Sequence, residues 1–103
     1  MQFSTLLQVI ARDLRKNDPK SLKLHMNSLK DLALSIDYSL RERYIIERRN
    51  DVKFIMDTLI RKPVSDINRG YIDGVMRPVL WGGRGIDHGK WRPHIPNAPD
   101  PWK

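Results

Sequence analysis

The sequence predicts an all-α fold, in which a small helical hairpin or three-helix body is followed by a long, irregular arm. Two observations predict the body: apolar residues recur at helical spacing through the first 62 residues, and no glycine or proline lies between Pro19 and Pro63. A third predicts the arm, because residues 78–103 contain all three tryptophans, four of the six glycines and five of the seven prolines. We therefore assign residues 1–77 to the helical body and residues 78–103 to the arm.

Residues 4–16 are predicted to form the first helix, with Ser4 as its N-cap. Basic residues in its last turns complement the negative end of the helix dipole. Asp18 and Pro19 are predicted to begin a second helix, and the short connection predicts that the two helices pack as an antiparallel pair. Apolar residues at intervals of three and four form one face of the first helix, namely Phe3, Leu6, Leu7, Ile10, Ala11 and Leu14.

Residues 20–62 allow two interpretations. In the first, the second helix ends near residue 36, and a third helix begins under an N-cap at Asp37 or Ser39. In the second, one helix of roughly 40 residues runs through the whole segment. The apolar spacing changes phase after Leu40, which favours a break or bend and therefore the first interpretation.

A short fourth helix is predicted from Ile67 to about Met76, after Pro63 has ended the preceding helical segment. Gly70 and Gly74 would share one face of this helix and would weaken it. No helix or central strand is expected from residue 78 onward, because proline removes backbone donors and glycine leaves the backbone unconstrained.

The chain has a formal net charge of +7, and residues 1–62 contribute +5 of it. A basic balance of this size is compatible with contacts to RNA, to anionic lipid or to an acidic protein surface. One cluster in the third helical segment can serve as a phosphate-binding or acid-binding face, but interleaved glutamate and aspartate residues favour an ordinary solvated surface. The candidate residues of this cluster are Arg41, Arg43, Arg48 and Arg49.

Catalytic residues, bound metal and cofactors are not expected from the sequence. The chain has no cysteine, which excludes a disulfide framework, a thiolate metal site and a cysteine nucleophile. His88 and His94, with Asp87 beside the first, form the one local acid–base group, and it lies in a Gly/Pro-rich segment that offers no rigid scaffold. His25 falls on the apolar face of the second helix, where we expect a hydrogen-bonded core histidine.

The arm is predicted to dock onto a partner protein. Its tryptophans are ten and eleven residues apart, which corresponds to about 30 Å in an extended chain and favours separate pockets. Tryptophan and arginine are the residue types most enriched among interface anchors. The alternative is that the arm covers its own helical body. The candidate partner-binding residues are Trp81, Arg84, Trp91, Arg92 and Trp102.

These features favour a non-catalytic accessory subunit of a large mitochondrial assembly, of the respiratory-chain or ATP-synthase type. The mitochondrial expectation rests on the amphipathic, Arg-bearing N-terminus, and a cytoplasmic location is the alternative. The expected partners are other protein subunits. Contact with a membrane surface stays open, although no run approaches the 18 apolar residues of a transmembrane helix. The main alternative is a mitochondrial ribosomal protein that binds rRNA through its arginine cluster, and a microtubule-associated protein is a third class.

Overall fold

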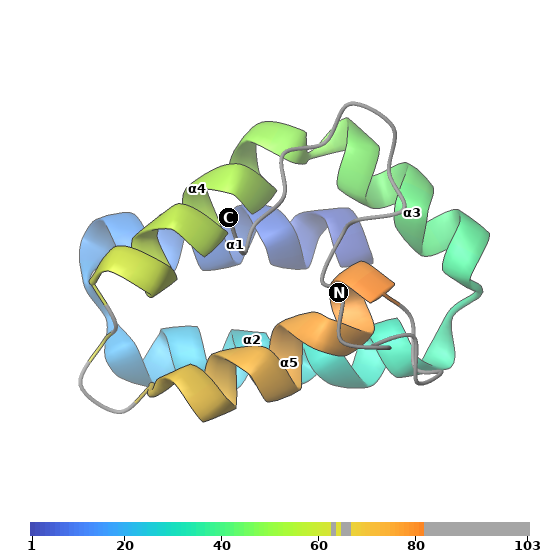
Figure 1. Cartoon of the computed structure of the whole chain (residues 1–103). Helices are drawn as coiled ribbons and strands as arrows, with labels where there is room; N and C mark the ends of the chain where they lie inside the picture. Colours follow the sequence, from blue (N-terminus) through green and yellow to red (C-terminus); the bar gives the residue numbers. More distant parts are fainter. Residues whose placement is uncertain (63, 65–66, 82–103) are drawn as a thin grey trace.

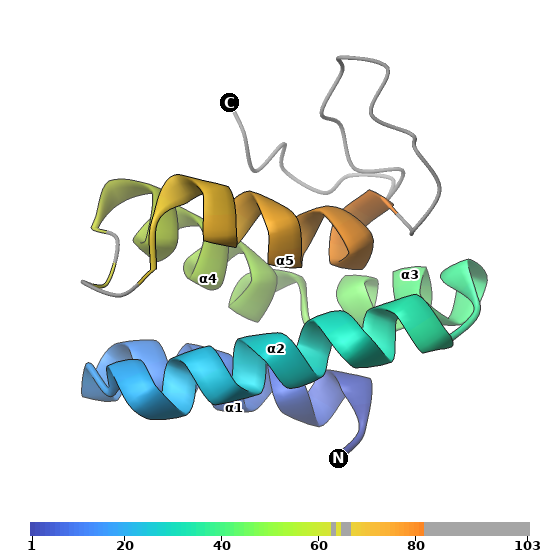
Figure 2. The same cartoon turned by 90° about the horizontal axis from the view of Figure 1, so that it is seen from below.

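The structure, a computed structural model, describes residues 1–62, 64 and 67–81, and this part of the chain is all-helical. Five helices form two layers, with α1 and α2 side by side in one layer and α3, α4 and α5 in the other (Figures 1 and 2). Helix α4 packs on α1, and α5 packs on α2. The all-α prediction is confirmed, but these residues form five helices, whereas a hairpin or three-helix body with a short fourth helix was expected. The helices are α1 (Phe3–Lys16), α2 (Pro19–Ser35), α3 (Tyr38–Glu47), α4 (Arg49–Arg61) and α5 (Arg69–Trp81).

Helix α1 lies at the centre of the packing, because it contacts α2, α3 and α4. Five of the six residues predicted for its apolar face are at most 2% exposed, and Leu14 is half-buried. The ring of Phe3 stacks on that of Tyr44 in α3, with 6.0 Å between the centroids. Among the described residues, twenty hydrophobic side chains between Phe3 and Leu80 are at most 8% exposed, so the five helices share one core.

The turn between α1 and α2 has the predicted chemistry. Asn17 adopts the left-handed conformation with φ of 54°, which asparagine tolerates better than most residues. Asp18 caps α2, and its carboxylate accepts a hydrogen bond from the Ser21 N–H at 3.2 Å. Pro19 occupies the first turn of α2, where its missing N–H costs nothing. The short turn therefore returns the chain along α1, as expected.

The predicted break after the second helix is confirmed, because α2 ends at Ser35 and α3 begins at Tyr38. The N-cap is Asp37, whose carboxylate accepts from the Ser39 N–H at 2.9 Å and from the Ser39 hydroxyl at 2.8 Å. These hydrogen bonds lower the pKa of Asp37 from its ordinary value. The interpretation with one long helix over residues 20–62 is wrong.

A second bend, at Arg48, divides the predicted third helix into α3 and α4. Hydrogen bonding continues across the bend, since the Arg48 N–H donates to the Tyr44 carbonyl and the Val52 N–H donates to the Arg48 carbonyl, both at 3.0 Å. No glycine or proline marks the position. The bend instead follows from packing, because α4 lies along α1 while α3 also reaches α5.

Helix α5 begins later and continues further than predicted. Asn68 caps it by accepting a hydrogen bond from the Tyr71 N–H at 2.8 Å, and the helix runs through Pro78 to Trp81. The expectation that no helix passes residue 78 is therefore wrong. Proline inside a helix costs about 3 kcal/mol, but Val79 and Leu80 are buried directly after it, and each such side chain contributes about 1.5–3 kcal/mol.

We expect Gly74→Ala to raise the free energy of unfolding by about 0.5–1 kcal/mol, because glycine inside a helix loses more backbone entropy than alanine. A Cβ atom at residue 74 meets nothing within 4 Å, so no packing penalty opposes the gain. Urea unfolding followed by circular dichroism measures the change. Gly70→Ala is the comparison, since its Cβ would lie 3.4 Å from the capping oxygen of Asn68. Destabilisation by Gly74→Ala would contradict the placement of this residue on the surface.

Asp37 should make stability fall in acid. Its folded pKa lies below the unfolded value, so its contribution is present above the unfolded pKa and is lost as the pH falls through the folded pKa. An asparagine side chain at this position would retain the cap geometry without a charge. We therefore expect Asp37→Asn to be less stable than the parent at pH 6 and to approach it at pH values below about 3.8, in urea midpoints measured across this range. A constant difference would argue against the proposed cap.

Candidate functional site

Arg41 lies inside the body rather than on its surface. The residue is 4% exposed, and its guanidinium donates through Nη1 to the backbone carbonyl of Pro78. Its Cζ atom also lies 5.3 Å from the centroid of the Tyr38 ring. Arg41 therefore joins the start of α3 to the last turn of α5, at Pro78, the first residue of the segment predicted to be the docking arm.

This contact supplies a hydrogen-bond donor to a backbone carbonyl at the end of α5. The last four carbonyls of a helix have no partner within it, and the carbonyl of Pro78 is one of them. A cation is also favourable at the negative end of the helix dipole. Burial lowers the pKa of Arg41 from its usual value, and the nearby Tyr38 and Asp37 oppose that shift. Arg41 is thus removed from the predicted phosphate-contacting cluster, because its polar group is used within the fold.

The other three arginines of the predicted cluster lie near the bend between α3 and α4. Arg43 is exposed and pairs with Glu47, with 3.6 Å between Nε and Oε1. Arg48 pairs with Asp51, and Arg49 is exposed on the first turn of α4. Arg48 and Arg49 border a depression of about 390 Å³ lined by residues 46–51. At this corner the carboxylates of Glu47 and Asp51 largely balance the charge of the arginines. Exposed ion pairs of this kind contribute only about 0–1 kcal/mol each to the free energy of unfolding.

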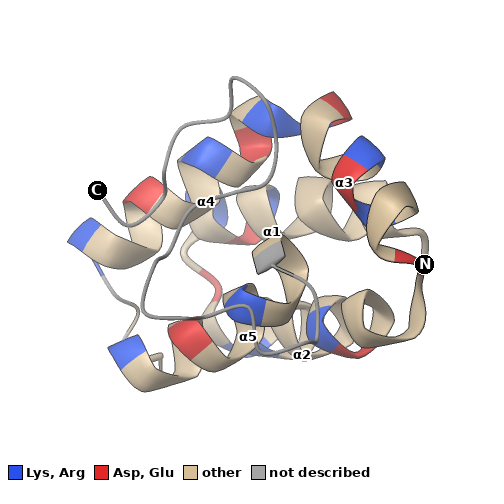
Figure 3. Cartoon of the chain, turned by 45° about the vertical axis from the view of Figure 1, so that its right-hand side comes forward, with Lys and Arg blue, Asp and Glu red and all other residues tan. Residues whose placement is uncertain are grey.

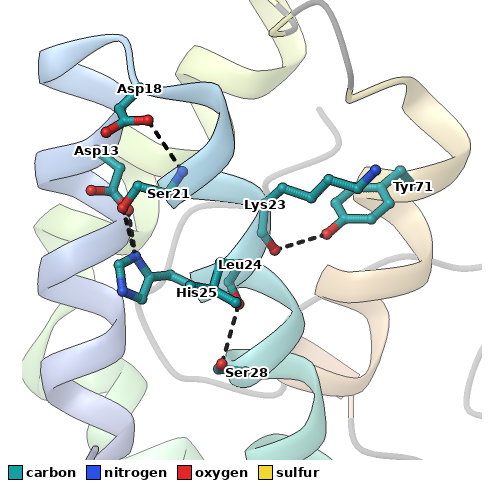
Figure 4. Close-up of polar contacts among 8 residues, drawn as sticks. All are labelled: Asp13, Asp18, Ser21, Lys23, Leu24, His25, Ser28 and Tyr71. Atoms are coloured by element: carbon teal, nitrogen blue, oxygen red, sulfur yellow. Dashed lines mark hydrogen bonds and ion pairs between the residues drawn. The ribbon is translucent and has the colours of Figure 1, made fainter.

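A polar pair that sequence reasoning missed connects α1 and α2 (Figure 4). Asp13 is only 3% exposed, and its Oδ2 atom lies 2.6 Å from Nδ1 of His25. The hydroxyl of Ser21 lies 3.2 Å from the same ring nitrogen. His25 is hydrogen-bonded, as predicted, but its side chain is 19% exposed and lies at the edge of the core rather than within it. Its partner was hidden, because the two residues are twelve positions apart and meet only when the helices pair.

This arrangement differs from a catalytic triad, although it contains serine, histidine and aspartate. In a triad the aspartate and the serine contact opposite nitrogens of the imidazole, so that a proton can pass from the serine to the far nitrogen. Here Asp13 and Ser21 both approach Nδ1. The carboxylate therefore accepts a hydrogen bond from the Nδ1–H group and orients the ring, so that the one buried acidic side chain among the described residues has a partner.

The predicted docking residues Arg84, Trp91, Arg92 and Trp102 lie outside the described residues, as do Asp87, His88 and His94. Trp81 is the last residue of α5. Within the described ranges, no three histidine or acidic side chains are grouped so that they could hold a metal ion. None of the helices described here is long and apolar enough to cross a membrane.

Comparisons with protein-family models, with curated proteins and with solved structures found no match to this chain. Its interpretation therefore rests on the contacts of the chain itself. Of those contacts, the one between Arg41 and Pro78 bears most directly on the predicted docking arm, because it holds the helix from which the arm continues.

We expect Arg41→Ala to lower the free energy of unfolding by about 2 kcal/mol or more, because it leaves a cavity and removes the donor to the Pro78 carbonyl. Arg43→Ala is the matched control: its side chain is 74% exposed, and its loss should change stability by less than about 0.5 kcal/mol. Chemical denaturation of both variants measures the difference. Equal effects would show that Arg41 does not hold α5.

Proposed function

We propose that this protein is a non-catalytic structural subunit of a large mitochondrial multiprotein assembly, of the respiratory-chain or ATP-synthase type. In this proposal the helices form a rigid body, and the C-terminal segment joins neighbouring subunits. Trp81, Arg84, Trp91, Arg92 and Trp102 supply the anchors. Tryptophan and arginine are enriched among residues whose loss weakens protein interfaces most.

The observation that carries the proposal is that the described helices already share one core of twenty buried hydrophobic side chains, from Phe3 to Leu80. The contact from Arg41 also holds Pro78 in the last turn of α5. Trp91 and Trp102 follow in sequence from this fixed point. Each carries about 150–250 Å² of surface that favours burial, and a partner subunit can provide the pockets.

The expected mitochondrial location rests on the first helix. Its exposed side carries Arg12, Arg15 and Lys16, while its other side is apolar. Amphipathic helices with arginine and hydroxyl residues are typical of mitochondrial targeting segments. The same helix is central to the core, so any targeting role would have to be compatible with its burial in the folded protein.

The alternative role, rRNA binding by Arg41, Arg43, Arg48 and Arg49, receives less support from these side chains. Arg41 donates to a backbone carbonyl inside the fold, and Arg43 and Arg48 face carboxylates close to them in sequence. A phosphate would have to compete with those carboxylates, which raises the cost of binding. The protein-docking proposal does not depend on these arginines.

The proposal is tested by deleting residues 82–103, which leaves all five helices in place. We expect the shortened chain to retain its helical circular dichroism and cooperative melt, but to sediment alone while the full chain sediments with its assembly from the source mitochondria. The double variant Trp91→Ala, Trp102→Ala should show the same loss, and Asn97→Ala is a control within the same segment. Crosslinks through Lys90 and Lys103 would identify the neighbouring subunits.

Retention of the shortened chain in the assembly would remove the docking role from this segment. A large loss of helical content would instead mean that the segment covers its own body. Crosslinks to ribosomal proteins would replace the respiratory-type assembly with the ribosomal alternative. A purely cytoplasmic distribution would contradict the mitochondrial part of the proposal.

A further inference from the structure

A group of cations gathers at one end of the molecule, which we call the basic pole. The pole comprises the α1–α2 turn and the adjoining ends of α4 and α5, and Figures 1 and 2 both place these segments at the same end. The Arg15 guanidinium lies 4.4 Å from the ring centroid of Phe54, and the Tyr71 hydroxyl donates to Oδ1 of Asn27 at 2.8 Å. These contacts join α1 to α4 and α2 to α5. The exposed basic residues beside them are Lys16, Lys20, Arg61, Lys62 and Arg69.

The pole holds more than half of the net charge of the protein. Residues 15–20 and 61–69 together contain six basic residues and two acidic ones, Asp18 and Asp66, which is a net +4 of the total +7. Asp18 is used as the cap of α2. Figure 3 shows basic residues where α4 ends and α5 begins. None of the five exposed cations of the pole forms an ion pair with a carboxylate in the described part of the chain.

Helix dipoles explain only some of these cations. Lys16 and Arg61 lie in the last turns of α1 and α4, where a positive charge is favourable. Lys20 and Arg69 lie in the first turns of α2 and α5, where a positive charge costs about 0.3–1 kcal/mol. The Asp18 carboxylate at the N-cap offsets part of this cost in α2, whereas no acidic residue lies in the first turn of α5. Neither of these two charges has an ion-pair partner among the described carboxylates, and an external anion can supply one.

We propose that the basic pole binds the phosphodiester backbone of a nucleic acid. The exposed described residues of the pole are, apart from Asp18 and Gly70, all lysine, arginine or asparagine. Protein–protein interface cores are depleted in lysine, and membrane-binding surfaces combine cations with exposed apolar side chains. Nucleic-acid interfaces are polar and strongly positive, and lysine, arginine and asparagine all donate to phosphate oxygens. The helix dipoles add little net potential there, because the N-termini of α2 and α5 lie at the same end as the C-termini of α1 and α4.

This inference goes beyond the proposed docking function, because it uses none of residues 78–103. Backbone contacts carry no sequence information. The pole should therefore bind single-stranded RNA and DNA of equal length with similar, salt-sensitive affinity. Affinity in the micromolar range is expected, as for other sequence-independent complexes.

The test measures fluorescence anisotropy of labelled RNA and DNA oligonucleotides of equal length with the full chain, over a series of salt concentrations. The pole variant is Lys20→Gln, Lys62→Gln, Arg69→Gln. The matched control, Arg43→Gln, Arg49→Gln, Lys53→Gln, makes the same change in net charge near the bend between α3 and α4. A third variant, Lys20→Arg, Lys62→Arg, Arg69→Lys, keeps the charge. Circular dichroism confirms that each variant is folded.

We expect the pole variant to lose at least about tenfold in affinity at physiological salt, and its slope of log K against log salt to become shallower by about 2–3. The matched control should change affinity by less than about threefold, and the charge-keeping variant should bind like the parent. The same proteins are also tested with poly-glutamate and with phosphatidylserine vesicles, both of which should bind at least about tenfold more weakly than RNA.

Equal losses in the pole variant and the control would overturn the proposal in favour of diffuse attraction by net charge. A larger loss in the control would move the site to the corner between α3 and α4. Tighter binding of poly-glutamate or vesicles, lost in the pole variant, would identify an acidic protein or an anionic membrane instead. Because residues 78–103 are unchanged in every variant, none of these outcomes bears on docking by that segment.

Discussion

The contact between Arg41 and the carbonyl of Pro78 constrains the second layer of the fold. It requires α3 to approach α5, and the chain therefore bends at Arg48 before α4 follows α1. It also supplies a donor for one of the last carbonyls of α5, which belongs to the proline that interrupts the hydrogen bonds of this helix. The end of α5, and with it the point from which the tryptophan-rich segment continues, depends on this interaction.

Two polar contacts in the interior each fix the position of one helix relative to another. Asp13 is buried with His25, and Arg41 is buried with a backbone carbonyl. Each joins two helices that are separate in sequence, and each would leave a charged group unpaired if those helices shifted. Apolar packing alone tolerates small changes of register, whereas these contacts are satisfied in one arrangement. They therefore help to give the body a single structure from which functional segments can extend.

The exposed cations separate into two groups with different surroundings. Near the bend between α3 and α4, acidic residues three or four positions away in sequence balance Arg43 and Arg48. At the basic pole, the cations lie on turns and helix ends that come together only in the fold, and the described carboxylates do not balance them. Helix α5 begins at the pole and ends beside Arg41, roughly 18 Å away at about 1.5 Å per residue. The two proposed binding functions are therefore assigned to opposite ends of one rigid element.

The sequence by itself determined the helical class, the apolar face of α1 and the cap at Asp18, and it narrowed the next cap to Asp37 or Ser39, because each depends on residues within a few positions of one another. Only the tertiary structure decided the bend at Arg48, the continuation of α5 through Pro78 and the burial of Arg41. In those places, packing against a distant helix outweighed local preference. The basic pole was hidden for the same reason, since its two segments are about 40 residues apart in sequence and meet only when α4 and α5 close over α1 and α2.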